Sequence, residues 1–423
     1  VNGAGSITLS LPQDIATTST PTFAGAFFTG NVDVVSISQA GTPATLAFQY
    51  ASDTGAAFYA EPNLGLGAGA LAGRKNAGNV AVGDGVLGQM ATTGYGTESG
   101  TWNTGVGYQA LYSNDYGDEN TALGYKSMYS NTTGYYNTAS GAWSLFSNTT
   151  GVNNTASGYY SLQANTTGYD NVAVGAYALR RNTTGYYNSA LGSNALYSNT
   201  TGYYNTAMGG YSMYLNTTGS NNTAVGNYAL FRNSTGGGNT TLGAFAGAYM
   251  DASSLVTAIG DNAAVDADGS ESVAIGAYAL NRFLGLYHVS VGNNSLGSLT
   301  TGNSNTALGH YAMPSLSSGD TNIAIGHRSG NTITTGNRNI LIGDLAANGT
   351  LTSNSNIALG HGATIGDALS YAVTIGNDSS VTTSNTVVLG RTIDSIVMGA
   401  TGDDGSGNKL QVTGGLRASG NVF

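Results

Sequence analysis

The chain of 423 residues contains no cysteine, only five prolines and very few charges. The lack of cysteine excludes disulfide bonds and thiolate metal sites. Charged residues make up 8% of the chain, whereas soluble globular domains average about 25%. No run approaches 18 consecutive apolar residues, so a membrane-spanning helix is excluded. If this chain folded into ordinary globular domains, it would have too few charged residues to cover their surfaces.

The composition argues against several other classes of protein. The 12 basic residues are scattered and the net charge is −10, which argues against nucleic-acid binding. The 65 glycines do not recur at every third position, so the chain is not collagen-like. Hydrophobic residues make up 40% of the chain and 27 residues are tyrosine, which does not fit a disordered chain.

A 17-residue repeat organises most of the sequence. A glycine that closes motifs such as NTALG recurs at every 17th position from Gly107 to Gly260. We call these residues the anchor glycines. Their register extends from Gly67 to Gly390, with a few slightly shorter steps and one clearly longer step, from Gly83 to Gly107. A short, nearly fixed period of this kind is typical of solenoid proteins.

Each repeat has a constant chemical pattern around its anchor glycine. The residue four before the anchor is usually asparagine, two before is usually alanine, and one before is a large aliphatic residue. Leucine or methionine stands four after the anchor, and SNTTGYY-like segments follow. This pattern predicts a short strand, a bend, a second short apolar strand and a turn. Asparagine and glycine suit such bends because they tolerate positive φ, whereas glycine and threonine in every unit argue against helices.

We therefore expect an all-β protein, a β-solenoid (parallel β-roll) of about 20 coils over residues 63–391. An N-terminal β-rich linker is expected at residues 1–62 and a C-terminal β segment at residues 392–423. Stacked strands about 4.8 Å apart would make a rod of roughly 95 Å. A single small coil cannot bury its own aliphatic row. Together with the low charge, this predicts that chains pack side by side, as a homotrimer.

One motif resembles a known repeat family. The segment Ser272–Gly276 and its variants NVAVG (Asn171–Gly175) and NIAIG (Asn322–Gly326) resemble the NSVAIG repeat in the heads of trimeric autotransporter adhesins. The resemblance implies left-handed parallel β-rolls, three chains side by side, with the aliphatic residues of the motif in a shared interior. The repeat of this chain is longer than the adhesin repeat by its NTTG segment.

The two ends resemble viral fibre proteins. Residues 1–30 resemble the β-rich linkers of phage tail fibres, and residues 408–423 resemble the segment before an endosialidase-type intramolecular chaperone. Such a chaperone trimerises the fibre and then cleaves itself off, which implies a mature chain ending at Phe423. We expect a structural, non-enzymatic trimeric tail fibre of a phage-like virus that projects a host-binding end. It would contact other tail or surface-anchor proteins without inserting into a membrane.

Two alternatives stay open at this point. The chain could be the head of a bacterial cell-surface adhesin, or the subunit of a self-polymerising extracellular filament. Neither alternative requires catalysis. Between Thr121 and Met250 the only acidic residue is Asp170, and there is no histidine. Hydrolysis by paired carboxylates has no residues to use there, and we expect no catalytic residue, cofactor or metal.

Three histidines follow anchor glycines, at His310, His327 and His361. Rings of imidazoles around a threefold axis could in principle hold an ion. No carboxylate partner is evident from the sequence, so we expect these histidines to be solvated or stacked.

Aromatic residues form two sets in the repeat. One set lies two residues after the anchor and is expected to stack as a structural ladder, although an exposed row could also bind sugars. Its members are Trp143, Tyr160, Tyr177, Tyr211, Tyr228 and Phe245. The other set lies in the turns and is the better candidate for contact with a receptor or a host surface glycan. Its members are Tyr135, Tyr136, Tyr186, Tyr187, Tyr203 and Tyr204.

The asparagines four before the anchor are expected to form a second structural ladder through turn and ladder hydrogen bonds. They are Asn120, Asn137, Asn154, Asn171, Asn188 and Asn205. Other asparagines, including Asn131, Asn148 and Asn182, satisfy the N-x-[ST] pattern. Sugar attachment is therefore an alternative explanation for part of the asparagine content.

Overall fold

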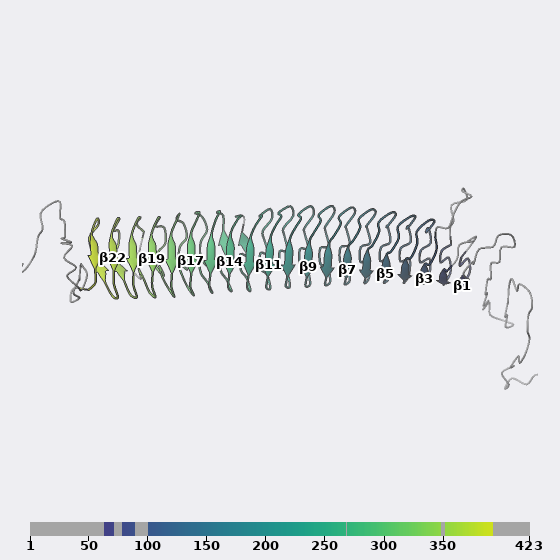
Figure 1. Ribbon diagram of the computed structural model, residues 1–423, viewed down its shortest axis with the longest axis horizontal. Helices are drawn as coiled ribbons and strands as arrows, with labels where there is room; N and C mark the ends of the chain where they lie inside the picture. The colour runs from purple at the N-terminus through teal and green to yellow at the C-terminus, as the bar shows by residue number, and fades with distance from the viewer. Residues whose placement is uncertain (1–62, 72–77, 89–99, 268, 348–351, 392–423) are drawn as a thin grey trace, which may run out of the picture.

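The computed structural model describes residues 63–71, 78–88, 100–267, 269–347 and 352–391, which form one long rod of stacked turns (Figure 1). All the regular elements in these ranges are β-strands, without a helix among them. The prediction of an all-β parallel solenoid is thus confirmed. The linker expected at residues 1–62 and the segment expected at residues 392–423 lie outside the described residues.

One parallel sheet of 20 strands runs the length of the rod. Each strand has three residues and pairs with the strand of the next turn, so that Thr138 of one turn lies beside Thr155 of the next. The strands are β1 Leu64–Leu66, β2 Val80–Val82, β3 Thr104–Val106, β4 Thr121–Leu123, β5 Thr138–Ser140, β6 Thr155–Ser157, β7 Val172–Val174, β8 Ser189–Leu191, β9 Thr206–Met208, β10 Thr223–Val225, β11 Thr240–Leu242, β12 Thr257–Ile259, β14 Val273–Ile275, β16 Val289–Val291, β17 Thr306–Leu308, β18 Ile323–Ile325, β19 Ile340–Ile342, β20 Ile357–Leu359, β22 Val373–Ile375 and β24 Val387–Leu389.

The second strand expected in every repeat forms in only a few of the described turns. Two further parallel pairs occur, β13 (Asp266–Ala267) with β15 (Arg282–Phe283), and β21 (Thr364–Ile365) with β23 (Ser380–Val381). In most other turns, positive φ angles bend the segment after the anchor, for example 61° at Trp143. This segment still bonds to the next turn through alternate backbone N–H groups.

The anchor glycines are required by conformation and by space. Gly141 has φ of 137°, and a Cβ there would lie 2.5 Å from the carbonyl oxygen of Gly158 in the next turn. Positive φ was also expected at the glycines of the turns. Gly151 does not have it, and glycine is needed there only because Gly168 and Asn148 approach closely. Positive φ falls instead on large residues such as Leu145, which occupy left-handed positions that usually favour glycine.

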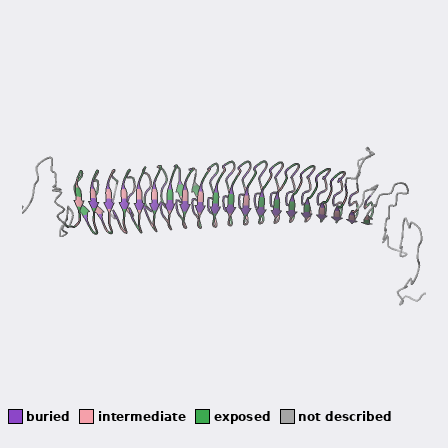
Figure 2. Ribbon diagram, in the orientation of Figure 1, coloured by how far each residue is buried: buried purple, intermediate pink, exposed green. Residues whose placement is uncertain are grey.

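The interior of each turn is small and almost entirely closed. It holds the alanine two before the anchor and the leucine or methionine four after it, such as Ala139 and Leu145, both fully buried. Only the middle residue of a strand points inward (Figure 2). The aliphatic residue one before the anchor points outward, and Leu123 and Leu191 are 41% and 48% exposed. The aliphatic row therefore lies on the outer face of the sheet, outside the coil.

Candidate functional site

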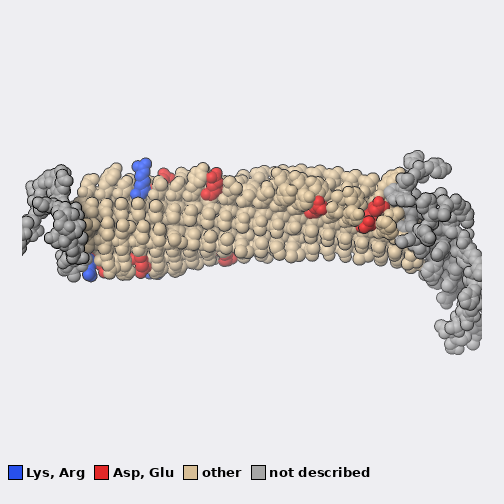
Figure 3. Space-filling model, in the orientation of Figure 1, with Lys and Arg blue, Asp and Glu red and all other residues tan. Residues whose placement is uncertain are grey.

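The outer face of the 20-stranded sheet is a continuous surface that runs the length of the rod. We call the outward side chains of these strands, the first and third residue of each, the strand face. They are all Val, Ile, Leu, Met, Thr or Ser, and every charged residue of the described ranges lies outside these strands. Figure 3 shows how few charged side chains interrupt one side of the rod. A strand of about 10 Å repeated over roughly 95 Å gives this face about 900 Å².

The turn tyrosines lie on the surface, as expected. Tyr135, Tyr136 and Tyr204 are 44%, 53% and 52% exposed. Tyr186 stacks on Tyr203 with ring centroids 5.1 Å apart and planes 3° from parallel, and the neighbouring pair of rings stacks at 5.0 Å. Rings this close cover one another's faces. This part of the surface therefore presents ring edges and hydroxyl groups to solvent.

The ring of Tyr135 is in a different setting. It meets Tyr136 edge to face, with centroids 5.1 Å apart. The corresponding position in the turn before is Asp118 and in the turn after is Val152, so no aromatic ring stacks on it from either side. A sugar that binds by ring stacking needs such an uncovered face. Tyr136 lies between Glu119 and Asn153 in the same way, so Tyr135 and Tyr136 are the members of this set with the best geometry for that contact.

The pKa values of two of the turn tyrosines, Tyr186 and Tyr187, are raised by their surroundings. The pKa of the Tyr187 hydroxyl is raised, mainly by the carboxylate of Asp170 and also by desolvation. The pKa of Tyr186 is raised by desolvation and by the neighbouring hydroxyls. Both groups therefore donate and accept hydrogen bonds as neutral hydroxyls at physiological pH.

The second aromatic set forms two stacked runs along the rod. Trp143 stacks on Tyr160 at 5.9 Å and Tyr160 on Tyr177 at 5.7 Å. The other run joins Tyr211, Tyr228 and Phe245 at 5.0 and 5.1 Å. Asn194 separates the two runs.

Cations lie over these rings. The guanidinium of Arg180 lies 5.0 Å from the Tyr160 ring centroid, and its Nη1 donates to the hydroxyl of Tyr197 at 2.7 Å. The ammonium of Lys126 lies 5.2 Å from the Trp143 ring centroid. Such contacts contribute about 0.5–1 kcal/mol each at exposed sites. Lys126 and Arg180 therefore pack against aromatic rings of their own chain.

The asparagine ladder is a chain of buried hydrogen bonds. The backbone N–H of Asn154 donates to Oδ1 of Asn137 at 2.9 Å, and its Nδ2 donates to the carbonyl of Gly168 at 2.8 Å. The same two bonds recur along the rod, and these side chains are fully buried. Each amide thus joins three consecutive turns.

A second buried asparagine column was not predicted. It lies seven residues after the anchor, and its members are Asn114, Asn131, Asn148, Asn165, Asn182, Asn199, Asn216 and Asn233. Nδ2 of Asn148 donates to Oδ1 of Asn131 at 2.8 Å and to the carbonyl of Gly151 at 3.0 Å. Asn131, Asn148 and Asn182, which satisfy N-x-[ST], belong to this column, and their amides are buried and bonded and so are inaccessible for sugar attachment. Its recurrence at every 17th position is the sequence signal that could have identified it.

His288 replaces asparagine in the ladder. Its Nε2–H donates to the carbonyl of Gly302 at 3.1 Å, and its Nδ1 accepts from the backbone N–H of Asn305 at 3.3 Å. The neutral ring thus copies the donor and the acceptor of a carboxamide. Burial lowers the pKa of His288 to about 4, against the opposing effects of the Gly302 bond and Asp320.

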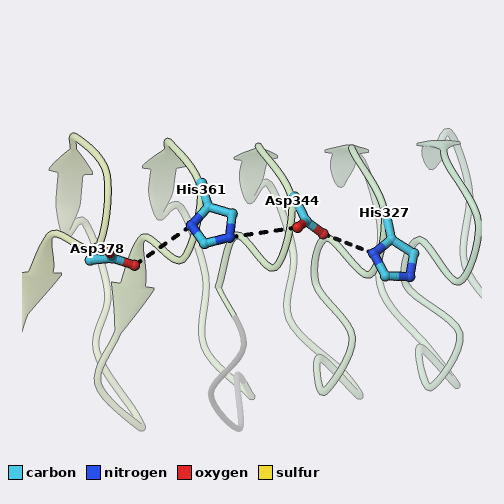
Figure 4. Close-up of polar contacts among 4 residues, drawn as sticks. All are labelled: His327, Asp344, His361 and Asp378. Carbon is cyan, nitrogen blue, oxygen red and sulfur yellow. Dashed lines mark hydrogen bonds and ion pairs between the residues drawn. The ribbon is translucent and has the colours of Figure 1, made fainter.

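The histidines after the anchors form an exposed row with carboxylates (Figure 4). His327 Nδ1 lies 2.8 Å from Asp344 Oδ1, and His361 lies 3.6 Å from both Asp344 and Asp378. His310 stacks on His327 with centroids 5.5 Å apart. Stacking was expected, but the expectation of no carboxylate partner was wrong. Asp344 follows His327 by one full repeat, which places it in the next turn.

Nothing in the described ranges groups three histidine or carboxylate side chains so that they could hold a metal ion. The same ranges contain no helix long and apolar enough to cross a membrane. Comparison of the chain with protein-family models and with curated protein sequences finds no match.

Proposed function

We propose that the chain is the non-enzymatic shaft of a homotrimeric fibre, in which three parallel rods bury their strand faces against one another. The observation that carries this proposal is the strand face itself, which is uncharged along 20 consecutive strands. Exposed apolar patches larger than a few hundred Å² mark interaction sites. A face of about 900 Å², divided between two neighbouring chains, is similar in total to the roughly 800 Å² that each partner buries in a standard stable interface.

A second copy of the chain is the partner that fits this face. The face is flat, repeats about every 4.8 Å and extends over the whole rod, so its complement must have the same period and length. Another rod of the same sequence meets both conditions. Three copies are proposed because the NSVAIG-like motifs resemble those of trimeric adhesin heads, where the aliphatic residues point into a shared interior.

We further propose that this fibre belongs to the tail of a phage-like virus and projects a host-binding end. The resemblance of both terminal segments to tail-fibre proteins supports the viral setting. Three parallel chains would present each surface contact three times, and such multivalency raises weak affinities. The turn tyrosines, with Tyr135 and Tyr136 foremost, are the candidate contacts for a host surface glycan.

Charges placed on the strand face test the proposed assembly. Leu191→Lys with Leu242→Lys puts two cations in the interface of each chain, and we expect native mass spectrometry to show monomers. The matched control, Tyr159→Lys with Tyr211→Lys, adds the same charges on the aromatic side and should remain trimeric. A monodisperse monomer for the unaltered chain would overturn the proposal.

The viral setting needs a separate test. Antibodies against the rod should label the tail fibres of a virus particle by electron microscopy, and an endosialidase-type chaperone should be encoded with the chain. Labelling of a bacterial envelope would favour the adhesin instead. Open-ended filaments grown from purified chain would favour the self-polymerising alternative.

A further inference from the structure

Strands β5 and β6 differ from the rest of the strand face. Their outward residues are Thr138 and Ser140 in one strand, and Thr155 and Ser157 in the next. Each of the other strands of the sheet carries at least one outward aliphatic side chain. The two strands are adjacent, so together they form the one stretch of the 20-stranded sheet that presents only hydroxyl-bearing side chains and no aliphatic side chain outward. We call these four residues the hydroxyl band.

Three identical repeat rods have a problem of alignment. Successive turns are about 4.8 Å apart and nearly equivalent, so one rod can slide past another by a whole turn. Such a slip exchanges Leu, Val, Ile and Met against one another, and hydrophobic exchanges of similar volume are well tolerated in packed interiors. The aliphatic part of the strand face therefore drives association without fixing the axial register.

The hydroxyl band removes this degeneracy. With the chains in register, the Ser140 hydroxyls of three copies meet at one level and the Ser157 hydroxyls at the next. A hydroxyl both donates and accepts, so three of them can satisfy one another around an axis. A slip of one turn leaves Ser140 of one copy facing Ser157 of the next, but it also sets Ser157 of the first against Val174 and Ser140 of the second against Leu123. Half of these serine hydroxyls are then buried without partners, which is unfavourable.

On the basis of the proposed trimer, we infer that the hydroxyl band specifies the register of the three chains. It acts as single polar positions do in coiled coils, where one buried polar layer selects one alignment. The partner it recognises is the same band in the other two copies. The serines contribute specificity to the assembly, while the aliphatic strands on either side contribute most of its affinity.

Disulfide trapping tests the inference, since the chain has no cysteine of its own. Two versions of the chain, Val225→Cys and Ile259→Cys, are co-expressed and oxidised. In register, these positions lie two turns apart, beyond the reach of a disulfide. A slip of one turn halves this separation, and a slip of two turns brings the positions level. Trypsin separates the two positions at Arg232, so mass spectrometry distinguishes homotypic from heterotypic cross-links.

We expect homotypic cross-links alone in the otherwise unaltered background. Adding Ser140→Val with Ser157→Val to both chains should raise the heterotypic fraction at least several-fold while the trimer persists. The matched control, Thr104→Val with Thr121→Val, also removes two hydroxyls from adjacent strands and should leave the register unchanged. Homotypic cross-links alone in the serine variant would overturn the inference. Monomers without any cross-link would overturn the trimer itself, which is a different outcome.

Discussion

One corner of the rod is built from hydrogen-bonded amides in its first half and from apolar side chains in its second. We call the position seven after the anchor the inner corner. It is asparagine from Asn114 to Asn233, and then Met250, Phe283, Leu299, Leu316 and Ile333, all buried. At the change, the Oδ1 atoms of Asn216 and Asn233 have no hydrogen-bond partner among the described residues. Two chemistries thus support the same stacked fold.

The difference appears in the repeat length. Every step from Gly107 to Gly243 has the same full length, whereas the steps from Gly260 to Gly276 and on to Gly292 are shorter by a single position. An amide column requires each donor to reach the acceptor of the next turn at about 2.9 Å. Apolar contacts are not directional, so an apolar corner accepts a shorter turn. The amide half is therefore the more regular half of the rod.

The largest loss of stability is expected at the anchor glycines, which both halves of the rod share. Gly141→Ala in the amide half and Gly326→Ala in the apolar half each place a Cβ against the carbonyl of the next anchor. Strained φ and overpacking together should cost about 5 kcal/mol at either site. Hydrogen exchange of the flanking turns measures this local loss. A large effect at only one site would mean that the two halves also differ in their backbone packing.

Exchanging the two corner types should cost somewhat less. Asn165→Leu leaves Oδ1 of Asn148 and one N–H of Asn182 buried without a partner, since both now bond to Asn165. At about 1–3 kcal/mol for each group, the expected loss is about 4 kcal/mol. The reverse change, Leu316→Asn, should also destabilise, because it buries an amide among apolar neighbours. Local hydrogen exchange in the two variants checks both, and a neutral result for either would show that the corner types are interchangeable.

A pH-dependent effect is expected near the junction of the halves, at His288. The folded protein keeps this ring neutral because burial lowers its pKa to about 4, while the unfolded chain takes up a proton below pH 6.5. Stability should therefore fall as pH drops from about 6.5 to about 4, by about 3 kcal/mol in total, and not change further below that window through this group.

His288→Asn restores the ladder amide and should remove this slope. Hydrogen exchange of residues 288–305 across the pH range is the measurement. An unchanged slope in the variant would assign the pH dependence to other groups.

The smallest effect is expected for the exposed charges of the second half. Asp344→Asn removes the ion pairs with His327 and His361, whose side chains are about half exposed. Exposed pairs contribute about 0–1 kcal/mol. The thermal unfolding temperature of this variant should change little at pH 7. Arg232→Ala, which removes an exposed ion pair with Asp251 in the first half, should also change it little. A larger loss in the Asp344 variant would make the histidine row part of the fold.

Much of the fold could be predicted from the sequence. The regular spacing of the anchor glycines identified the solenoid. The second strand predicted for every repeat was wrong for most of the described turns, because positive φ at Trp143 and Leu145 bends this segment as it closes a small turn. Neither residue type signals that conformation on its own.

The site was predicted less completely. Turn tyrosines were correctly placed on the surface, but only the structure shows that Tyr186 and Tyr203 cover each other while Tyr135 stays open. The inner asparagines and the partner of His327 were missed. In both cases residues one repeat apart in the sequence become direct neighbours, and their chemistry depends on that contact.

The sequence alone determined the period of this protein and its β architecture, because these follow from which residue types recur and how often. Only the tertiary structure decided which side of each strand faces out, since such short strands give too little alternation to tell. That decision placed the aliphatic row and the hydroxyl band on one uncharged surface. This surface has no charged side chain, in keeping with the low charge of the whole chain. It is continuous because stacking many short strands aligns their outward residues into one face.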